Sequence, residues 1–141
     1  MVTHTGQPPS RHVALEQVGV AGGRDWKRIG PDGKPIGGFP FRVPEGQMLV
    51  VTDVDWRYFG GTRGQIQTLT IFLRPLDDPE EEGDAVFEST IKLNNRGEGG
   101  ISVAMTTGFV VSSNGFIFPE MDSPGGGGFN VRLRGYLCDE S

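Results

Sequence analysis

Residues 48–58 constrain the fold more than any other part of the chain, because apolar and charged side chains alternate along them. The segment follows a Pro44-Glu45-Gly46 turn. Its even positions carry Met48, Val50, Val54, Trp56 and Tyr58, and its odd positions carry Asp53, Asp55 and Arg57. Successive side chains of a β-strand point to opposite faces of its sheet. The alternation therefore predicts a strand with one buried face and one face in water.

Similar short runs of alternating residues, separated by turns, recur along the chain. We expect further strands at residues 12–20, 69–73, 85–93, 101–106, 109–111, 116–118 and 129–137. Asn114-Gly115 is a strong hairpin sequence and predicts that 109–111 pairs with 116–118. The turn residues 94–100 likewise predict a hairpin between 85–93 and 101–106.

Glycine and proline define the loops of this chain. Its 23 glycines and 10 prolines cluster between the candidate strands, and no segment shows sustained helical spacing or a βαβ alternation. We therefore predict an all-β fold, an antiparallel β-sandwich of jelly-roll-like organisation with long Gly/Pro-rich loops. Residues 12–141 are expected to form this single domain, and residues 1–11 to form a flexible N-terminal arm.

Charge and hydropathy narrow the range of partners. The net charge of −5 argues against a nucleic-acid partner, because binding to phosphates needs a basic surface. No apolar run approaches the roughly 18 residues of a membrane span. Residues 1–10 lack the apolar core of a signal peptide. We expect the protein in the cytoplasm, or assembled into an extracellular or virion particle.

The chain offers little for catalysis. Its only histidines, His4 and His12, lie in or beside the expected arm, where no rigid imidazole is available for acid–base or nucleophilic chemistry. With Cys138 as the only cysteine, no grouped zinc ligands occur. No glycine-rich segment matches a phosphate-binding loop. We therefore expect a protein that is not an enzyme, with no catalytic residue, no metal ligand set and no cofactor.

Carboxylates form the first candidate site. Asp53 and Asp55 share one strand face at a spacing of about 7 Å. A pair at that spacing suits a hard cation or a hydrolase, whereas the simpler interpretation is a solvated face with Arg57 as a diagonal counter-charge. The acidic loop 77–84 is a weaker candidate for Ca²⁺, because its residue order departs from that of an EF-hand.

Aromatic residues form the second candidate site. Trp26 lies in a glycine-rich loop and is a candidate platform for stacking on a sugar, or alternatively an anchor that closes one end of the sandwich. Trp56 and Tyr58 share the apolar side of their strand and are expected in the core. Arg132 and Arg134 occupy one face of the last strand, where they are available to an acidic strand or subunit. The binding residues predicted are therefore Trp26, Asp53, Asp55 and Arg57.

Three functions remain open. The first is a non-enzymatic structural protein, a subunit of a homo-oligomer, filament or virion-like particle, in which the arm and the strand at 12–20 pair with the sheet edge of a neighbour. The second is a lectin-like module that binds glycans through Trp26. The third is a carboxylate-pair hydrolase built on Asp53 and Asp55.

Overall fold

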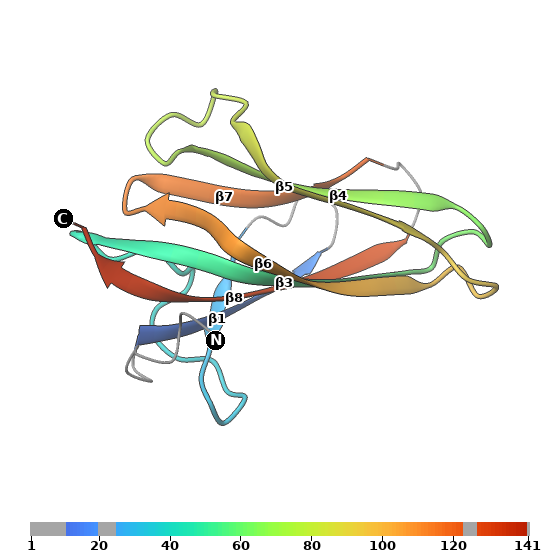
Figure 1. The fold of residues 1–141 in the computed structure, drawn as a ribbon, viewed down its shortest axis with the longest axis horizontal. Helices are drawn as coiled ribbons and strands as arrows, with labels where there is room; N and C mark the ends of the chain where they lie inside the picture. Colours follow the sequence, from blue (N-terminus) through green and yellow to red (C-terminus); the bar gives the residue numbers. More distant parts are fainter. Residues whose placement is uncertain (1–10, 20–24, 123–126, 141) are drawn as a thin grey trace.

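The structure is a computed structural model that describes residues 11–19, 25–122 and 127–140. These described residues form eight strands: β1 (His12–Gly19), β2 (Lys27–Ile29), β3 (Gln47–Phe59), β4 (Ile66–Pro75), β5 (Asp84–Lys92), β6 (Gly99–Ser112), β7 (Gly115–Met121) and β8 (Gly128–Asp139). They form two facing sheets (Figure 1). The expected arm lies outside the described residues, except Arg11.

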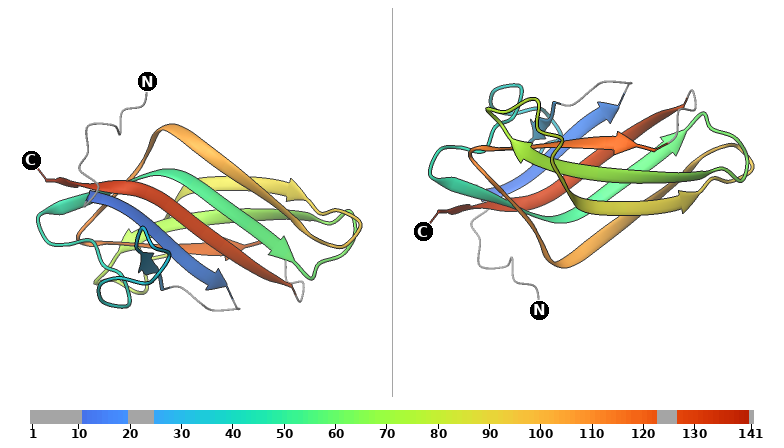
Figure 2. Two further views of the ribbon diagram at one scale, coloured as in Figure 1. Left: turned by 90° about the horizontal axis from the view of Figure 1, so that it is seen from below. Right: turned by 90° about the horizontal axis from the view of Figure 1, so that it is seen from above.

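The two sheets are antiparallel and unequal in size. The larger sheet has the order β2-β1-β8-β3-β6, and the smaller has the order β5-β4-β7. The left panel of Figure 2 shows β1, β8, β3 and β6 side by side, and the right panel shows the smaller sheet above them. The predicted class, an antiparallel β-sandwich of jelly-roll-like organisation, is confirmed.

Both predicted hairpins are wrong in their pairing, although the turns are present. β5 pairs with β4 in the smaller sheet, while β6 pairs with β3 in the larger one. The Asn114-Gly115 turn likewise joins β6 of the larger sheet to β7 of the smaller sheet. A turn sequence specifies that the chain reverses direction, but the sheet that the next strand joins depends on distant partners. Both turns therefore pass from one layer to the other.

A bulge in β3 corrects the predicted faces of that strand. The register of β3 against β6 and β8 shifts between Val51 and Asp53. An extra residue in a strand reverses the alternation beyond it. The core side chains of β3 are accordingly Leu49 and Val51 before the bulge, and Val54, Trp56 and Tyr58 after it. Met48 and Val50, which the pattern assigned to the same face as Trp56, are not part of the core cluster.

Glycine makes this irregularity possible on the neighbouring strand. Residues 105–108 of β6 lie opposite Thr52 alone, since the register passes from Asp53–Ala104 to Val51–Phe109. Gly108 has a φ of 73°, and a Cβ added there would lie 2.0 Å from the carbonyl oxygen of Val51. Only glycine allows the two backbones to approach this closely.

The core fills the space between the sheets. Trp56 is fully buried and its Nε1 donates a hydrogen bond of 2.9 Å to Ser89 Oγ on β5, which ties the sheets together. Tyr58 is buried as predicted.

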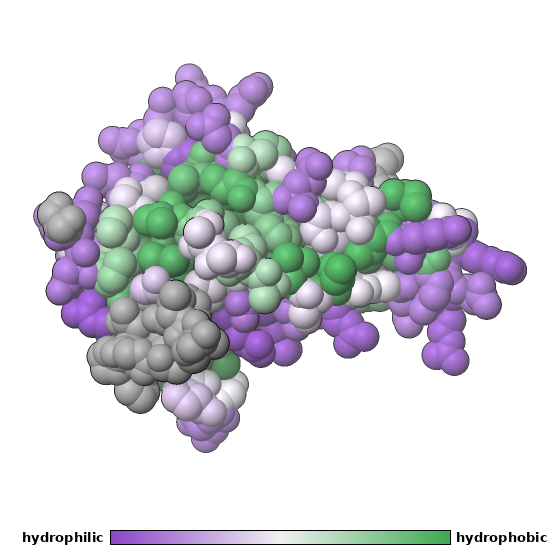
Figure 3. Space-filling model, in the orientation of Figure 1, coloured by the Kyte–Doolittle hydropathy of each residue, from purple (hydrophilic) through white to green (hydrophobic). Residues whose placement is uncertain are grey.

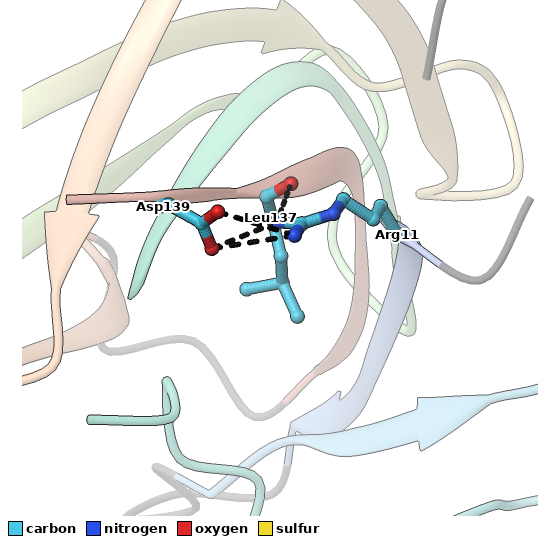
Figure 4. A network of polar contacts seen from close by, with 3 residues as sticks. All are labelled: Arg11, Leu137 and Asp139. Carbon is cyan, nitrogen blue, oxygen red and sulfur yellow. Dashed lines mark hydrogen bonds and ion pairs between the residues drawn. The ribbon is translucent and has the colours of Figure 1, made fainter. Parts of the chain in front are cut away.

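Directly before β1, Arg11 donates hydrogen bonds of 3.3 Å to Asp139 and one of 3.5 Å to the carbonyl oxygen of Leu137 (Figure 4). These contacts connect Arg11 to β8.

Candidate functional site

A row of alternating charges crosses the outer face of the larger sheet. Lys27 on β2, Glu16 on β1, Arg132 on β8 and Asp55 on β3 occupy matching register positions on successive strands. Glu16 lies 3.7 Å from Lys27 Nζ and 2.9 Å from Arg132 Nε. Because the Arg132 side chain is 60% exposed, each ion pair stabilises the fold by less than about 1 kcal/mol. The row leaves this part of the surface close to neutral.

Asp53 and Asp55 lie next to arginines of β8. In the β3–β8 register Asp53 is opposite Arg134, and Asp55 is opposite Arg132. Both aspartates and both arginines line a hollow of about 110 Å³. The carboxylates therefore share a face, as predicted, and their nearest cross-strand counter-charges are these two arginines. Arg57, the counter-charge expected from the sequence, follows two residues after Asp55 on β3, and its own cross-strand partners are Asn130 and Gly100.

This arrangement gives the hydrolase hypothesis little support. A carboxylate pair that hydrolyses a glycoside flanks a bound substrate and places its acid and its base on either side of the scissile bond. Here the two carboxylates follow one another on a single strand, each opposite a guanidinium group, and the hollow that they line is small. In the described part of the chain, no group of three or more His, Cys, Asp or Glu side chains is arranged to hold a metal ion.

Trp26 lies in the core rather than on the surface. Its side chain is 2% exposed, and its Nε1 donates a hydrogen bond of 3.0 Å to the carbonyl oxygen of Ile117 on β7. A ring buried in this way has no face on which a sugar can stack. Its position matches the alternative interpretation, an anchor that closes one end of the sandwich.

An open hollow lies on the outer face of the larger sheet, beside β2 and the loop that follows it. Its volume is about 830 Å³. The lining includes Pro31 and Ile36 of the loop, and His12, Arg134 and Tyr136 of the neighbouring strands. Figure 1 shows this loop extending below the larger sheet. No sequence pattern predicts this hollow, because its residues come from distant segments.

The edges of the sheets differ strongly in their protection against pairing with other strands. Natural proteins protect an edge with charges, proline, short length or a β-bulge, and the bulge at 105–108 gives β6 this protection only beyond Ala104. β2 has only three residues, β5 carries Asp84, Glu88 and Lys92, and β7 contains Pro119. β6 has 14 residues with no charge and no proline. Among the described strands, only this edge of the larger sheet is both long and free of charge.

The solvent exposure of the residues of β6 agrees with its position at a free edge of the sheet. Residues 100–102 are exposed, and Val103 and Met105 are half-buried. Figure 3 shows a band of apolar and neutral residues across the middle of the face on which β6 lies. The uncharged run was visible in the sequence, but its place at a sheet edge depends on the pairing of β3 with β6.

The strand predicted at 12–20 exists as β1. It pairs with β8 along its whole length, while on its other side β2 pairs only with Ala14, Leu15 and Glu16. Pairing of the arm and this strand with the sheet edge of a neighbour stays a prediction.

Comparison with known proteins shows no family. No protein-family description and no curated protein matches the chain. Among solved structures, the chain is similar to one in the cryo-EM atomic structure of Broad Bean Stain Virus, at 13% identity and a TM-score of 0.35, covering 95% of this chain and 80% of that chain. A likeness this weak carries no argument about function. Among the described residues no helix is long and apolar enough to cross a membrane.

Proposed function

We propose that this protein is a non-enzymatic structural subunit that assembles with copies of itself through the free edge of β6. The observation that carries this proposal is the contrast between β6 and the other sheet edges. β6 is an edge strand without a charge or a proline, and its regular part before the bulge at 105–108 presents a row of backbone N–H and C=O groups that no neighbouring strand pairs with. Such an edge is a template for adding another strand.

The contrast matters because an unprotected edge is a hazard for a protein that works alone. Long, uncharged edges promote aggregation, and natural sheets rarely expose one without a partner. The other three edges of this sandwich follow that rule, each with a different device. The same chain therefore protects three edges and leaves one accessible, which favours a specific partner at β6. The assembly expected is a homo-oligomer, a filament or a virion-like particle.

A charge placed on the edge tests the proposal. Ala104 is exposed on β6, so Ala104→Lys adds a positive charge there without filling the core. We expect the wild-type protein to form concentration-dependent oligomers in analytical ultracentrifugation, and the Ala104→Lys variant to remain monomeric. Thr90→Lys on the edge strand β5 is the matched control and is expected to assemble like the wild type. A wild-type protein that stays monomeric across the concentration series contradicts the proposal.

A glycan-binding module is the second candidate, supported by the hollow beside β2 rather than by Trp26. Small-molecule sites commonly have volumes of about 300–1,000 Å³, and this hollow of about 830 Å³ is lined by Tyr136 together with His12 and Arg134. A glycan array probed with the wild-type protein and with Tyr136→Ala tests this function. Binding that is lost in the variant supports it, and the absence of any signal from the wild type argues against it.

A further inference from the structure

We infer that residues 100–104 of β6 pair antiparallel with the same residues of a second copy, about a two-fold axis through Ser102. The inference rests on the proposed function and names its partner strand and geometry. Pairing of this kind joins the larger sheets of two subunits into one continuous sheet. The same surface is used on both subunits, so the contact is isologous and closes on itself.

Because β6 carries no charge, it is able to pair with a copy of itself. In a two-fold antiparallel pair each side chain lies opposite its own copy or a nearby residue of the same strand. A charged strand would therefore bring like charges together, which destabilises pairing. β5 places the exposed Glu88 in that position, and β7 lacks a backbone N–H at Pro119. β6 has neither obstacle.

The side chains of residues 100–104 suit close pairing on both faces of the sheet. On the outer face Gly100, Ser102 and Ala104 are small and leave room for the partner backbone. On the core-facing side, Ile101 lies opposite Trp56 in register and is 43% exposed, with the half-buried Val103 beside it. Contact with the same two residues of the partner removes apolar surface from water.

The charges of the neighbouring strand β3 favour the register centred on Ser102. In this register Gly100 lies opposite Ala104 of the partner. Gly100 is the β6 neighbour of Arg57, and Ala104 is the β6 neighbour of Asp53. The Arg57 side chain lies against Gly100, since a Cβ added to that glycine would be 3.0 Å from Arg57 Cγ. Arg57 of each subunit therefore lies in the same cross-strand row as Asp53 of the other subunit, once on each side of the axis.

The bulge in β6 limits the length of the pairing. Residues 105–108 depart from the regular register, and Gly108 has a positive φ. The straight part of the strand ends at Ala104, so the interface is short. An interface of this size is weak, and it depends on backbone hydrogen bonds and apolar contacts more than on charge. We therefore expect a dimer in rapid exchange whose dissociation constant changes little with salt concentration.

Disulfide trapping tests the pairing directly. Residues directly opposite each other in an antiparallel pair have Cα atoms about 4.5–5.5 Å apart, which suits a disulfide. In a Cys138→Ser background, Ser102→Cys is expected to form a covalent dimer under mild oxidation, at least about 10-fold faster than Glu88→Cys on the β5 edge. Non-reducing gels give the rate of cross-linking, sedimentation gives the mass, and far-UV circular dichroism confirms that each variant is folded.

The outcomes separate the inference from the proposed function. A covalent dimer of Ser102→Cys that forms no larger species supports the isologous pairing. If the wild-type protein oligomerises while Ser102→Cys cross-links no faster than Glu88→Cys, the copies meet elsewhere and the inference is overturned, although self-assembly stands. If the wild type remains monomeric and neither cysteine cross-links, both are overturned.

Discussion

Gln67 is a buried amide whose replacement by methionine should stabilise the protein. The side chain lies on β4, is 0% exposed, and both Oε1 and Nε2 are buried without a hydrogen-bond partner in the described structure. Burying an amide without a partner costs about 1–3 kcal/mol in protein mutational data. Methionine is an unbranched side chain of similar length that adapts to irregular packing. We expect Gln67→Met to raise the free energy of unfolding by about 1–3 kcal/mol.

Equilibrium unfolding in urea measures this change, with fluorescence of the two buried tryptophans as the signal. For a domain of this size, 1 kcal/mol corresponds to a shift in Tm of about 3–4 °C, so thermal unfolding gives a second measurement. The matched control is Gln65→Met. Gln65 Oε1 accepts a hydrogen bond of 2.9 Å from the backbone N–H of Thr62, so this variant should lose stability.

The signs of the two changes in the free energy of unfolding show whether the Gln67 amide has a hydrogen-bond partner. If Gln67→Met lowers the free energy of unfolding by 1 kcal/mol or more, the amide is hydrogen-bonded in solution, for example by a buried water, and the reasoning is refuted. If both variants are destabilised equally, methionine itself is poorly accommodated in this sheet. Opposite signs at the two positions confirm that the buried amide lacks a partner.

Three further changes test the fold. Gly108→Ala forces a positive φ on alanine and places its Cβ against the carbonyl oxygen of Val51. Urea unfolding should therefore show a decrease of more than about 3 kcal/mol in the free energy of unfolding. An unchanged urea midpoint would mean that the β6 bulge is absent. Trp26→Phe removes the hydrogen-bond donor to the carbonyl oxygen of Ile117 and leaves a cavity. Calorimetry should show a decrease of about 2–4 kcal/mol in the free energy of unfolding. An unchanged Tm would place Trp26 at the surface. Arg11→Ala removes the ion pair with Asp139 and the hydrogen bond to the carbonyl oxygen of Leu137, so urea unfolding should show a decrease of about 1–2 kcal/mol in the free energy of unfolding. A larger decrease would show that these contacts anchor β1.

Local alternation located every strand except β2, although it divided β6 into two strands at 101–106 and 109–111. The expected strand at 12–20 corresponds to β1, and the segment at 48–58 corresponds to most of β3. The class of the fold followed from many short strands with Gly/Pro turns. The faces of β3 were only half correct, because the bulge at Thr52 depends on the register with β6 and β8 and leaves no mark in the alternation.

Features that depend on pairing between distant strands were not predictable. The sheet assignment of β6 and β7 required knowledge of their partners, so both hairpins were misassigned. Trp26 was ambiguous because a tryptophan in a glycine-rich loop is compatible with a surface site and with the core. The carboxylates of Asp53 and Asp55 were placed correctly on one face, but the arginines opposite them come from β8, near the other end of the chain.

The central place of β8 in the larger sheet has a consequence for folding during synthesis. β8 lies between β1 and β3, and His12 is in register with Tyr136. β1 therefore cannot join its main partner until the ribosome has released residues 128–139. Pairing between strands so far apart in sequence closes a long loop and is slow. Until then β1 has only β2 as a neighbour in the sheet, and one side of β3 stays unpaired.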